Sequence, residues 1–175
     1  MIRFLAILAA LLFGSDHHAG ASKLVCAQPD RAALAVEALA TLERVPWSAE
    51  YRATLSQVAT EAGYRAGVDP VRLLALCWQE SRCLPRTSPD GCACGVAQVR
   101  SDRCIPGRPT CDQLLDPATG FRWAAERLAR RPDLAAYAGG DGGAARTVNQ
   151  RYAARHEALY VSLCATVLDC AYSVP

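Results

Sequence analysis

The sequence lacks the basic clusters that are typical of nucleic-acid-binding proteins. Its formal net charge is only +2 over 175 residues, and its arginines are spread along the chain without a run rich in Lys or Arg. Lys23 is the single lysine. We interpret the excess of arginine as a bias in composition rather than a functional signal. Because so small a charge gives little attraction to phosphates, we expect no nucleic-acid partner.

A long hydrophobic run is also missing beyond the first residues. No stretch there reaches the roughly 20 apolar residues of a membrane-spanning helix. Internal repeats and low-complexity segments are absent as well. The hydrophobic content of 51% and charged content of 21% are those of an ordinary folded protein and argue against disorder. We therefore expect one domain over residues 28–175, soluble, without stable membrane insertion and monomeric.

The N-terminus has the parts of an export signal. The apolar run FLAILAALLF (4–13) follows a short positive start and is too short to span a bilayer. Ala19 and Ala21 fit an A-x-A cleavage pattern. We expect a signal peptide over residues 1–21, with cleavage as late as residue 27, and hence a periplasmic or secreted protein. An uncleaved membrane anchor is the alternative, which the short core disfavours.

The chain has many cysteines and an export signal. This combination predicts disulfides that form in an oxidising compartment. If Cys26 leaves with the signal, an even number remains; their pairing is left open. Zinc is the alternative, but the C-x-C spacing of four of them does not match the paired C-x2-C of zinc knuckles. The nine cysteines are Cys26, Cys77, Cys83, Cys92, Cys94, Cys104, Cys111, Cys164 and Cys170, and the four zinc candidates are Cys92, Cys94, Cys104 and Cys111.

Helical patterns cover most of the chain beyond the signal, which predicts an all-α fold. Asp69, followed by Pro70, is expected to cap the start of a central helix that is apolar almost all round. The other expected helices are 31–45 ending at Pro46, 49–67, 116–131, a short one after Pro132 and a longer one from about Ala144.

Residues 84–112 have no helical pattern and are rich in proline, glycine and cysteine. We expect an irregular loop region stapled by disulfides, with a strand only at GVAQV (95–99). The glycines of GGDGG (139–143) are expected to form a turn, because the preceding strand and the following Lys-Ser/Thr of a phosphate loop are missing.

The central helix carries an unexpected acid. Leu73, Leu76, Cys77 and Glu80 fall at positions i, i+3, i+4 and i+7, so the carboxyl group of Glu80 shares a face with apolar side chains. Apolar surroundings disfavour the charged form and raise the pKa. A carboxylic acid that is still protonated near neutral pH is what a glycosidase uses to protonate a leaving oxygen. The alternative is a buried glutamate paired with an arginine.

The residues that follow favour the enzymatic interpretation. The segment ESRCLPRTSPDGCACGVAQV (80–99) resembles the signature of the soluble lytic transglycosylases of the SLT type, in the lysozyme superfamily. Glu80, Ser81, Pro85 and Gln98 match that signature in place. Three further blocks resemble the family in the right order: AGVDPVRLLALCWQES (66–81), LLDPATGFRWAAERL (114–128) and LAAYAGGDGG (134–143). The resemblance covers residues 55–160 and implies a lysozyme-like domain.

The resemblance also implies the reaction and the roles of the site residues. Glu80 would act first as acid and then as base, cleaving the β-1,4 bond between N-acetylmuramic acid and N-acetylglucosamine of peptidoglycan glycan strands and closing a 1,6-anhydro ring. Ser81, Gln98, Tyr137 and Tyr152 would orient or bind the substrate, and neither a metal nor an organic cofactor would be needed. For Ser81 the alternative is a cap at the helix end.

The chain departs from the family pattern at the cleft. Val96 and Ala97 stand where the family has Leu-Met, and Ala138 replaces an asparagine after the tyrosine. These departures bear on substrate length and rate more than on the class of reaction. His156, at helical spacing from Tyr152, is expected to be a solvated helix residue rather than a catalyst.

Two alternatives of different kinds remain. A hydrolysing muramidase would need a second carboxylate to activate water or trap the sugar, and none of the available aspartates sits in a recognisable motif. A catalytically inactive peptidoglycan-binding or interaction module would keep the fold without the reaction. The aspartates in question are Asp90, Asp102, Asp112, Asp116 and Asp141.

Overall fold

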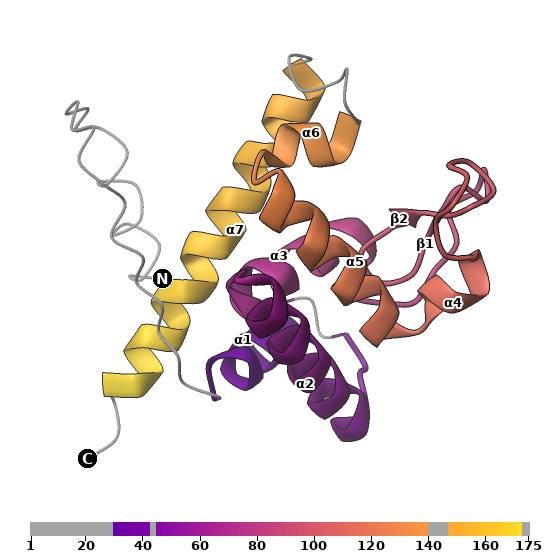
Figure 1. Ribbon diagram of the computed structural model, residues 1–175. Helices are drawn as coiled ribbons and strands as arrows, with labels where there is room; N and C mark the ends of the chain where they lie inside the picture. The colour runs from indigo at the N-terminus through magenta and orange to yellow at the C-terminus, as the bar shows by residue number, and fades with distance from the viewer. Residues whose placement is uncertain (1–29, 43–44, 140–146, 173–175) are drawn as a thin grey trace.

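The computed structural model describes residues 30–42, 45–139 and 147–172, and their fold is mostly helical, which confirms the predicted all-α class (Figure 1). The expected signal peptide and most of the GGDGG turn lie outside the described residues. The helices are α1 (Asp30–Leu42), α2 (Ala49–Ala66), α3 (Pro70–Ser81), α4 (Cys111–Leu115), α5 (Pro117–Arg130), α6 (Leu134–Gly139) and α7 (Thr147–Tyr172). Two short strands, β1 (Ala93–Cys94) and β2 (Val99–Arg100), pair antiparallel.

Helix α3 lies at the centre, with α1, α2, α5 and α7 around it (Figure 1). Asp69 Oδ1 accepts a hydrogen bond from the backbone N–H of Val71, and Pro70 takes the first helical position, as predicted. The helix ends where Arg82 adopts a left-handed conformation, with φ 58°. Its sequence is apolar nearly all round because it contacts a neighbour on almost every side. The buried residues of α3 are Val71, Leu73, Leu74, Ala75, Leu76, Cys77, Trp78 and Ser81.

The boundaries of the other predicted helices shift by a few residues. Helix α1 is described to Leu42, residues 43–44 lie outside the described part, and Val45, the predicted last residue, is not helical. The residue before a proline is restricted to extended conformations, so Pro46 disfavours helix before its own position. Helix α2 starts after Ser48, whose side chain accepts from the N–H of Tyr51, and ends at the left-handed Gly67. Helix α7 is described from Thr147 onward, and the start predicted near Ala144 lies outside the described residues.

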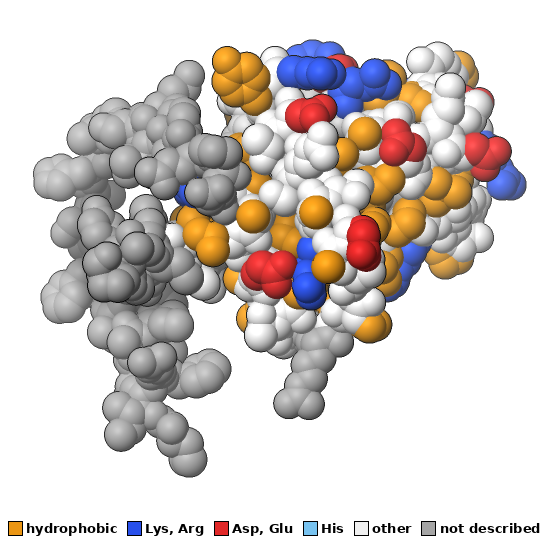
Figure 2. All heavy atoms as spheres, turned by 90° about the horizontal axis from the view of Figure 1, so that it is seen from below, with side chains coloured by type: hydrophobic (Ala, Val, Ile, Leu, Met, Phe, Trp, Pro, Cys, Tyr) orange, Lys and Arg blue, Asp and Glu red, His pale blue; other side chains and the backbone are white. Residues whose placement is uncertain are grey.

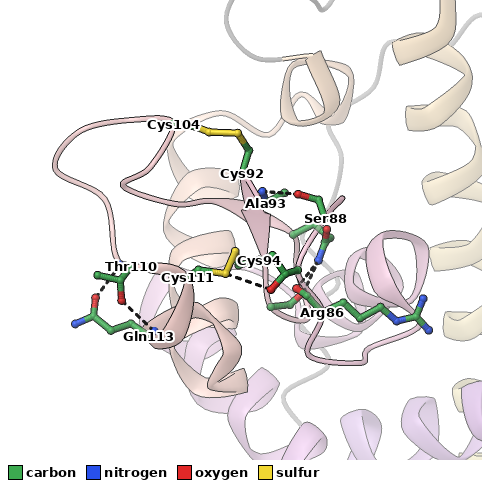
Figure 3. Close-up of a disulfide and its surroundings, with 12 residues drawn as sticks. Arg86, Ser88, Cys92, Ala93, Cys94, Cys104, Thr110, Cys111 and Gln113 are labelled. Atoms are coloured by element: carbon green, nitrogen blue, oxygen red, sulfur yellow. Dashed lines mark hydrogen bonds between the residues drawn. A yellow bond between two sulfur atoms is a disulfide. The ribbon is translucent and has the colours of Figure 1, made fainter. Parts of the chain in front are cut away.

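Residues 82–111 form the region that we call the stapled region. Its hairpin of β1 and β2 is tied down by the disulfides Cys92–Cys104 and Cys94–Cys111 (Figure 3). A third disulfide, Cys77–Cys83, joins its start to α3. The predicted disulfides are thus confirmed, and the zinc alternative for these cysteines is wrong because all four are paired in bridges.

The strand predicted at residues 95–99 is wrong, because residues 95–98 form the turn between β1 and β2. Gly95 has φ 81° and Gln98 has φ 47°, and neither value is compatible with an extended strand. A Cβ atom on residue 95 would lie 1.9 Å from the carbonyl oxygen of Leu114. Glycine is therefore required where this turn packs against α4.

Helix α4 has no counterpart among the predicted helices. Thr110 and Gln113 form a capping box, in which the side chain of each residue bonds the backbone N–H of the other (Figure 3). Cys111 begins the helix and carries the disulfide to Cys94. The short helix thereby anchors β1.

The remaining surface has a mixed character. On the face seen in Figure 2, acidic side chains stand singly among neutral and apolar ones, and basic side chains gather at the upper edge. None of the described helices combines the length and the apolar character that crossing a membrane requires.

Candidate active site

A cleft with a volume of about 1090 Å³ lies where the end of α3, the stapled region, the second half of α5, α6 and α7 meet. Four of the five predicted site residues line it: Glu80, Gln98, Tyr137 and Tyr152. Ser81 does not. The other lining residues are Ser88, Asp90, Cys92, Ala93, Val99, Arg100, Ile105, Arg108, Trp123, Arg127, Arg130 and Arg131.

Glu80 lies in the last turn of α3, half-buried, with its carboxyl group facing the cleft. Burial raises the pKa of Glu80 to about 7, although the hydrogen bond from Tyr152 acts in the opposite direction. Among the described residues, no arginine forms an ion pair with this carboxyl group. The alternative of a buried Glu–Arg pair is therefore not what the structure shows. A carboxyl group with this pKa holds its proton at neutral pH about half of the time and can act as acid and as base.

Tyr152 approaches Glu80 from α7. Its hydroxyl donates a hydrogen bond to Oε1 of Glu80, and its own carbonyl oxygen accepts from Nε2 of Gln79 at 3.0 Å. Burial and the neighbouring Glu80 raise the pKa of Tyr152, so its hydroxyl keeps its proton and remains a donor. Tyr152 thus holds the carboxyl group in place and stabilises its ionised form.

His156 lies one turn further along α7, and the prediction that it is solvated is wrong. Its side chain is fully buried, and its Nε2 lies 3.2 Å from the carbonyl oxygen of Arg72. Burial lowers the pKa of His156, which favours the neutral ring. Tyr160, another turn along, donates to Asp69 at 2.9 Å. Through these residues, one face of α7 makes polar contacts with α3 and with its N-cap residue Asp69. We therefore assign His156 a role in joining α7 to α3 rather than in catalysis.

The predicted substrate contact of Ser81 is not supported by its position. Ser81 is 3% exposed, and its hydroxyl donates to the carbonyl oxygen of Val96 at 2.8 Å. The side chain that follows Glu80 in a helix points away from the Glu80 face by about 100°, which here directs Ser81 into the stapled region. Ser81 therefore positions the turn at residues 95–98 and does not line the cleft.

Gln98 and Tyr137 line the cleft but also hold this turn. The Nε2 of Gln98 donates to the carbonyl oxygens of Arg86 and Gly95, each at 3.0 Å. The hydroxyl of Tyr137 donates to the carbonyl oxygen of Ala97 at 3.0 Å. Residues 95–98 are thus fixed by side chains from α3, from α6 and from the turn itself. What remains for a ligand is the amide oxygen of Gln98 and the ring of Tyr137.

Asp90 is the other carboxylate of the cleft. Its Oδ1 accepts from the hydroxyl of Ser88 and from the backbone N–H of Cys92, and these hydrogen bonds lower its pKa. Asp116 instead caps α5. Asp102 and Asp112 do not line the cleft, and Asp141 lies outside the described residues. Asp90 is therefore the candidate second carboxylate that sequence reasoning did not single out.

Sequence reasoning also missed five arginines and a tryptophan in the cleft. Arg127 and Arg130 stand at i and i+3 in the last turn of α5, a spacing that places them on one helix face, and Arg131 follows the helix directly. That spacing was a readable signal. The contributions of Arg100, Arg108 and Trp123 depend on how the stapled region folds back on α5, which no local pattern encodes.

The chemistry available here is proton transfer by Glu80, in a cleft that Asp90 also lines as a carboxylate with a lowered pKa. Among the described residues, no group of three or more His, Cys, Asp or Glu side chains could hold a metal ion. Comparisons with protein families, with curated proteins and with solved structures find no match to this chain.

Proposed function

We propose that the protein is a glycan-cleaving enzyme with a lysozyme-like fold, a lytic transglycosylase that acts on peptidoglycan. The observation that carries this proposal is Glu80, a carboxyl group with a pKa near 7 in a large cleft, hydrogen-bonded by Tyr152. The sequence resemblance to SLT-type transglycosylases names the reaction. The cleft is large enough to take several sugar rings of a strand.

In the proposed reaction, Glu80 gives its proton to the oxygen that links N-acetylmuramic acid to N-acetylglucosamine. The bond between the anomeric carbon and this oxygen breaks, and the N-acetyl group of the muramic acid stabilises the positive charge. The Glu80 carboxylate, hydrogen-bonded by Tyr152, then takes the proton of the muramoyl 6-hydroxyl. The 6-oxygen closes a 1,6-anhydro ring on the anomeric carbon, Glu80 regains its proton, and no water is consumed.

Hydrolysis is the second candidate, and Asp90 favours it. An ionised carboxylate in the same cleft could activate a water molecule or trap the sugar, as the second acid of a hydrolysing muramidase does. Replacing Asp90 by asparagine separates the candidates. We expect a change of less than about threefold if the enzyme is a transglycosylase, and a loss of about 100-fold or more if Asp90 takes part in hydrolysis.

The protein acts outside the cytoplasm in this proposal. Three disulfides among the described residues are typical of proteins that fold in an oxidising compartment. Together with the predicted signal peptide, they support a periplasmic or secreted location. Fractionation of expressing cells, with the mass of the recovered chain, would show both the compartment and the cleavage site.

The test of the reaction is digestion of purified peptidoglycan sacculi followed by mass spectrometry of the released ends. Anhydromuramic ends, each one water lighter than a reducing end, support the transglycosylase. Reducing ends overturn it in favour of the hydrolase. Absence of cleavage by the wild-type chain, with binding retained, overturns both in favour of an inactive binding module. Glu80→Gln is the control for contaminating activities.

A further inference from the structure

Helix α3 ends immediately after the acid. Glu80 and Ser81 are its last two residues. Arg82 and Cys83 follow with φ values of 58° and 53°, which lie in the left-handed region. This conformation is unfavourable for a residue with a Cβ atom, and helices that end on a left-handed residue usually place a glycine there. Here two such residues follow each other and neither is glycine, so other contacts must hold them.

The disulfide Cys77–Cys83 spans this helix end. It joins residues that are 6 apart in the sequence, and Glu80 stands midway between them. The backbone N–H of Cys83 donates to the carbonyl oxygen of Cys77 at 2.9 Å, so a covalent bond and a hydrogen bond link the same two residues. The N–H of Arg82 donates to the carbonyl oxygen of Trp78 at 3.0 Å. The last turn of α3 is therefore closed by the bridge and by these two hydrogen bonds.

A second helix fixes the same cysteine. The hydroxyl of Tyr51 in α2 donates to the carbonyl oxygen of Cys83 at 2.6 Å. Cys77 and Cys83 are both 0% exposed, so a reductant in solution does not reach the bridge in the folded chain. The bridge is thus a constant part of the fold rather than a redox switch.

Stabilisation of the whole chain is the smaller part of what this bridge contributes. In the loop-entropy model, the stabilisation by a disulfide grows with the number of residues that it encloses. The other two bridges span 12 and 17 residues, against 6 for Cys77–Cys83. Cys77–Cys83 therefore restricts the unfolded chain least of the three. Its main effect is local, at the helix turn that carries Glu80.

The position of Glu80 requires such a local restraint. The end turns of helices lack some of the hydrogen bonds of the interior and open readily. The carboxyl group of Glu80 must nevertheless meet the hydroxyl of Tyr152 on α7 and stay buried. Opening of the last turn would break that hydrogen bond and admit water to the carboxyl group.

We propose that the Cys77–Cys83 disulfide positions the catalytic acid. It holds Arg82 and Cys83 in the left-handed conformation, so that the last turn of α3 stays closed and the carboxyl group of Glu80 stays directed into the cleft. The inference rests on the proposed function, in which Glu80 transfers the proton. The two cysteines are positioning residues, since neither of them lines the cleft.

The experiment compares two variants of the full chain that lack the bridge. The alanine variant combines Cys77→Ala with Cys83→Ala, and the glycine variant combines Cys77→Ala with Cys83→Gly. Glycine adopts the left-handed conformation without a steric penalty, yet it fills the core less than alanine does. A role in packing alone predicts that the glycine variant is the more damaged of the two. A positioning role predicts the opposite order.

We expect the alanine variant to lose about 30-fold in kcat for the cleavage of peptidoglycan, with KM within about twofold of the wild type. The carboxyl group is displaced in this variant, whereas the rest of the cleft is unchanged. The glycine variant should recover about threefold or more of the lost kcat.

Two further readouts do not depend on cleavage. In the wild type, the amides of Arg82 and Cys83 should exchange hydrogen within about tenfold of the rates in the middle of α3, and in the alanine variant they should exchange about tenfold faster or more. The pKa of Glu80, followed by NMR, should fall by about one unit in the alanine variant because water reaches the carboxyl group. Tyr137 and Tyr152, whose pKa values respond to Glu80, are retained in both variants.

The matched control removes a different bridge. Cys94→Ala with Cys111→Ala opens a disulfide of the stapled region that encloses a longer segment. We expect this control to leave unchanged both the exchange at the end of α3 and the pKa of Glu80.

Three results would overturn the proposal: full kcat in the alanine variant, a glycine variant no better than the alanine variant, or rapid exchange of the Arg82 and Cys83 amides in the wild type. The last measurement needs no variant and decides the question if the alanine variant does not fold. The proposed function is judged separately, by digestion of sacculi with the wild type. If the wild type cleaves no glycan while the exchange rates and the Glu80 pKa change as expected, the reaction is rejected and the restraint on the carboxyl group stands.

Discussion

The two walls of the cleft are built in different ways. The wall that carries Glu80 belongs to helices packed by apolar side chains, with α3 buried on nearly every side. The opposite wall is the stapled region, where β1 and β2 have two residues each and two disulfides tie the hairpin down. Irregular segments bury too little apolar surface to hold their own shape. Covalent bridges here replace the packing that fixes the helical wall.

The two walls meet at the turn formed by residues 95–98. Ser81 of α3 and Tyr137 of α6 each donate to a carbonyl oxygen of this turn, those of Val96 and Ala97. The difference between the walls indicates a division of roles. The helical wall determines the pKa of Glu80, whereas the stapled wall determines which ligand fits in the cleft next to Glu80. Damage to each wall should therefore leave a different signature.

The largest expected effect comes from the acid itself. Glu80→Gln removes the transferable proton, and we expect cleavage of sacculi to fall by about 100-fold to 10,000-fold. At high pH the folded state of this variant should also be more stable than that of its parent. A folded-state pKa near 7, above the unfolded value, gives stability that is present at acid pH and is lost as the pH rises through 7.

Thermal unfolding at two pH values checks the second part. Glutamine cannot ionise, so the variant should be more stable than its parent by about 1–3 kcal/mol at pH 8 and similar to it at pH 4. A variant that is less stable than its parent at pH 8 would show that ionisation of Glu80 does not destabilise the folded state, and the raised pKa would be contradicted.

A cavity in the helical wall should affect stability and leave the chemistry unchanged. Leu55 of α2 is fully buried and does not line the cleft. Leu55→Ala should lower the free energy of unfolding by about 2–5 kcal/mol in a urea titration. The rate per folded molecule should stay within about twofold of the parent. A large loss of rate in fully folded protein would mean that the helical packing tunes Glu80 from a distance.

Removal of a disulfide from the stapled region should instead reduce cleavage and leave the helical wall intact. Cys94→Ala with Cys111→Ala opens the bridge between β1 and α4, whose loss costs about 3 kcal/mol for a loop of this length. We expect faster hydrogen exchange at Val99 and Arg100, unchanged protection in α3, and cleavage reduced by about tenfold or more. Full activity with an opened hairpin would show that the stapled wall does not contact the substrate.

A smaller loss of rate than that of Glu80→Gln is expected where α7 meets the acid. Tyr152→Phe deletes the hydrogen bond that lowers the Glu80 pKa, so that pKa should rise further above 7. The alkaline limb of the pH–rate profile should then move to higher pH, and the maximum rate should fall by about tenfold. Tyr160→Phe, which loses a similar hydrogen bond to Asp69 far along the same helix, is the matched control and should leave the profile unchanged.

The sequence predicted the helical wall better than the stapled one, for a physical reason. Helix starts at Asp69 and Asp116 depend on side chains next to the helix in the chain, and these local signals are visible in the sequence. The acid on the apolar face of α3 was visible in the same way. The strand predicted at 95–99 failed because alternation of apolar residues does not reveal a left-handed Gln98.

The roles within the site were less predictable than their positions. Ser81, Gln98 and Tyr137 all lie at or beside the cleft, and each donates a hydrogen bond to a carbonyl oxygen of the turn, which the sequence did not indicate. Those bonds depend on how the turn packs against α3 and α6. Of the arginines that line the cleft, Arg100 and Arg108 come from other segments than the end of α5, and they gather beside it only in the folded chain.

The most direct test of the account is a titration of the Glu80 carboxyl group in the full chain. Carbon-13 NMR of protein labelled at the glutamate side chain, with Glu80→Gln to assign the resonance, would follow its ionisation. We expect a pKa of about 7. A pKa near 4.3, that of a glutamate in water, would contradict the account, because the acid would then have no proton to donate at neutral pH.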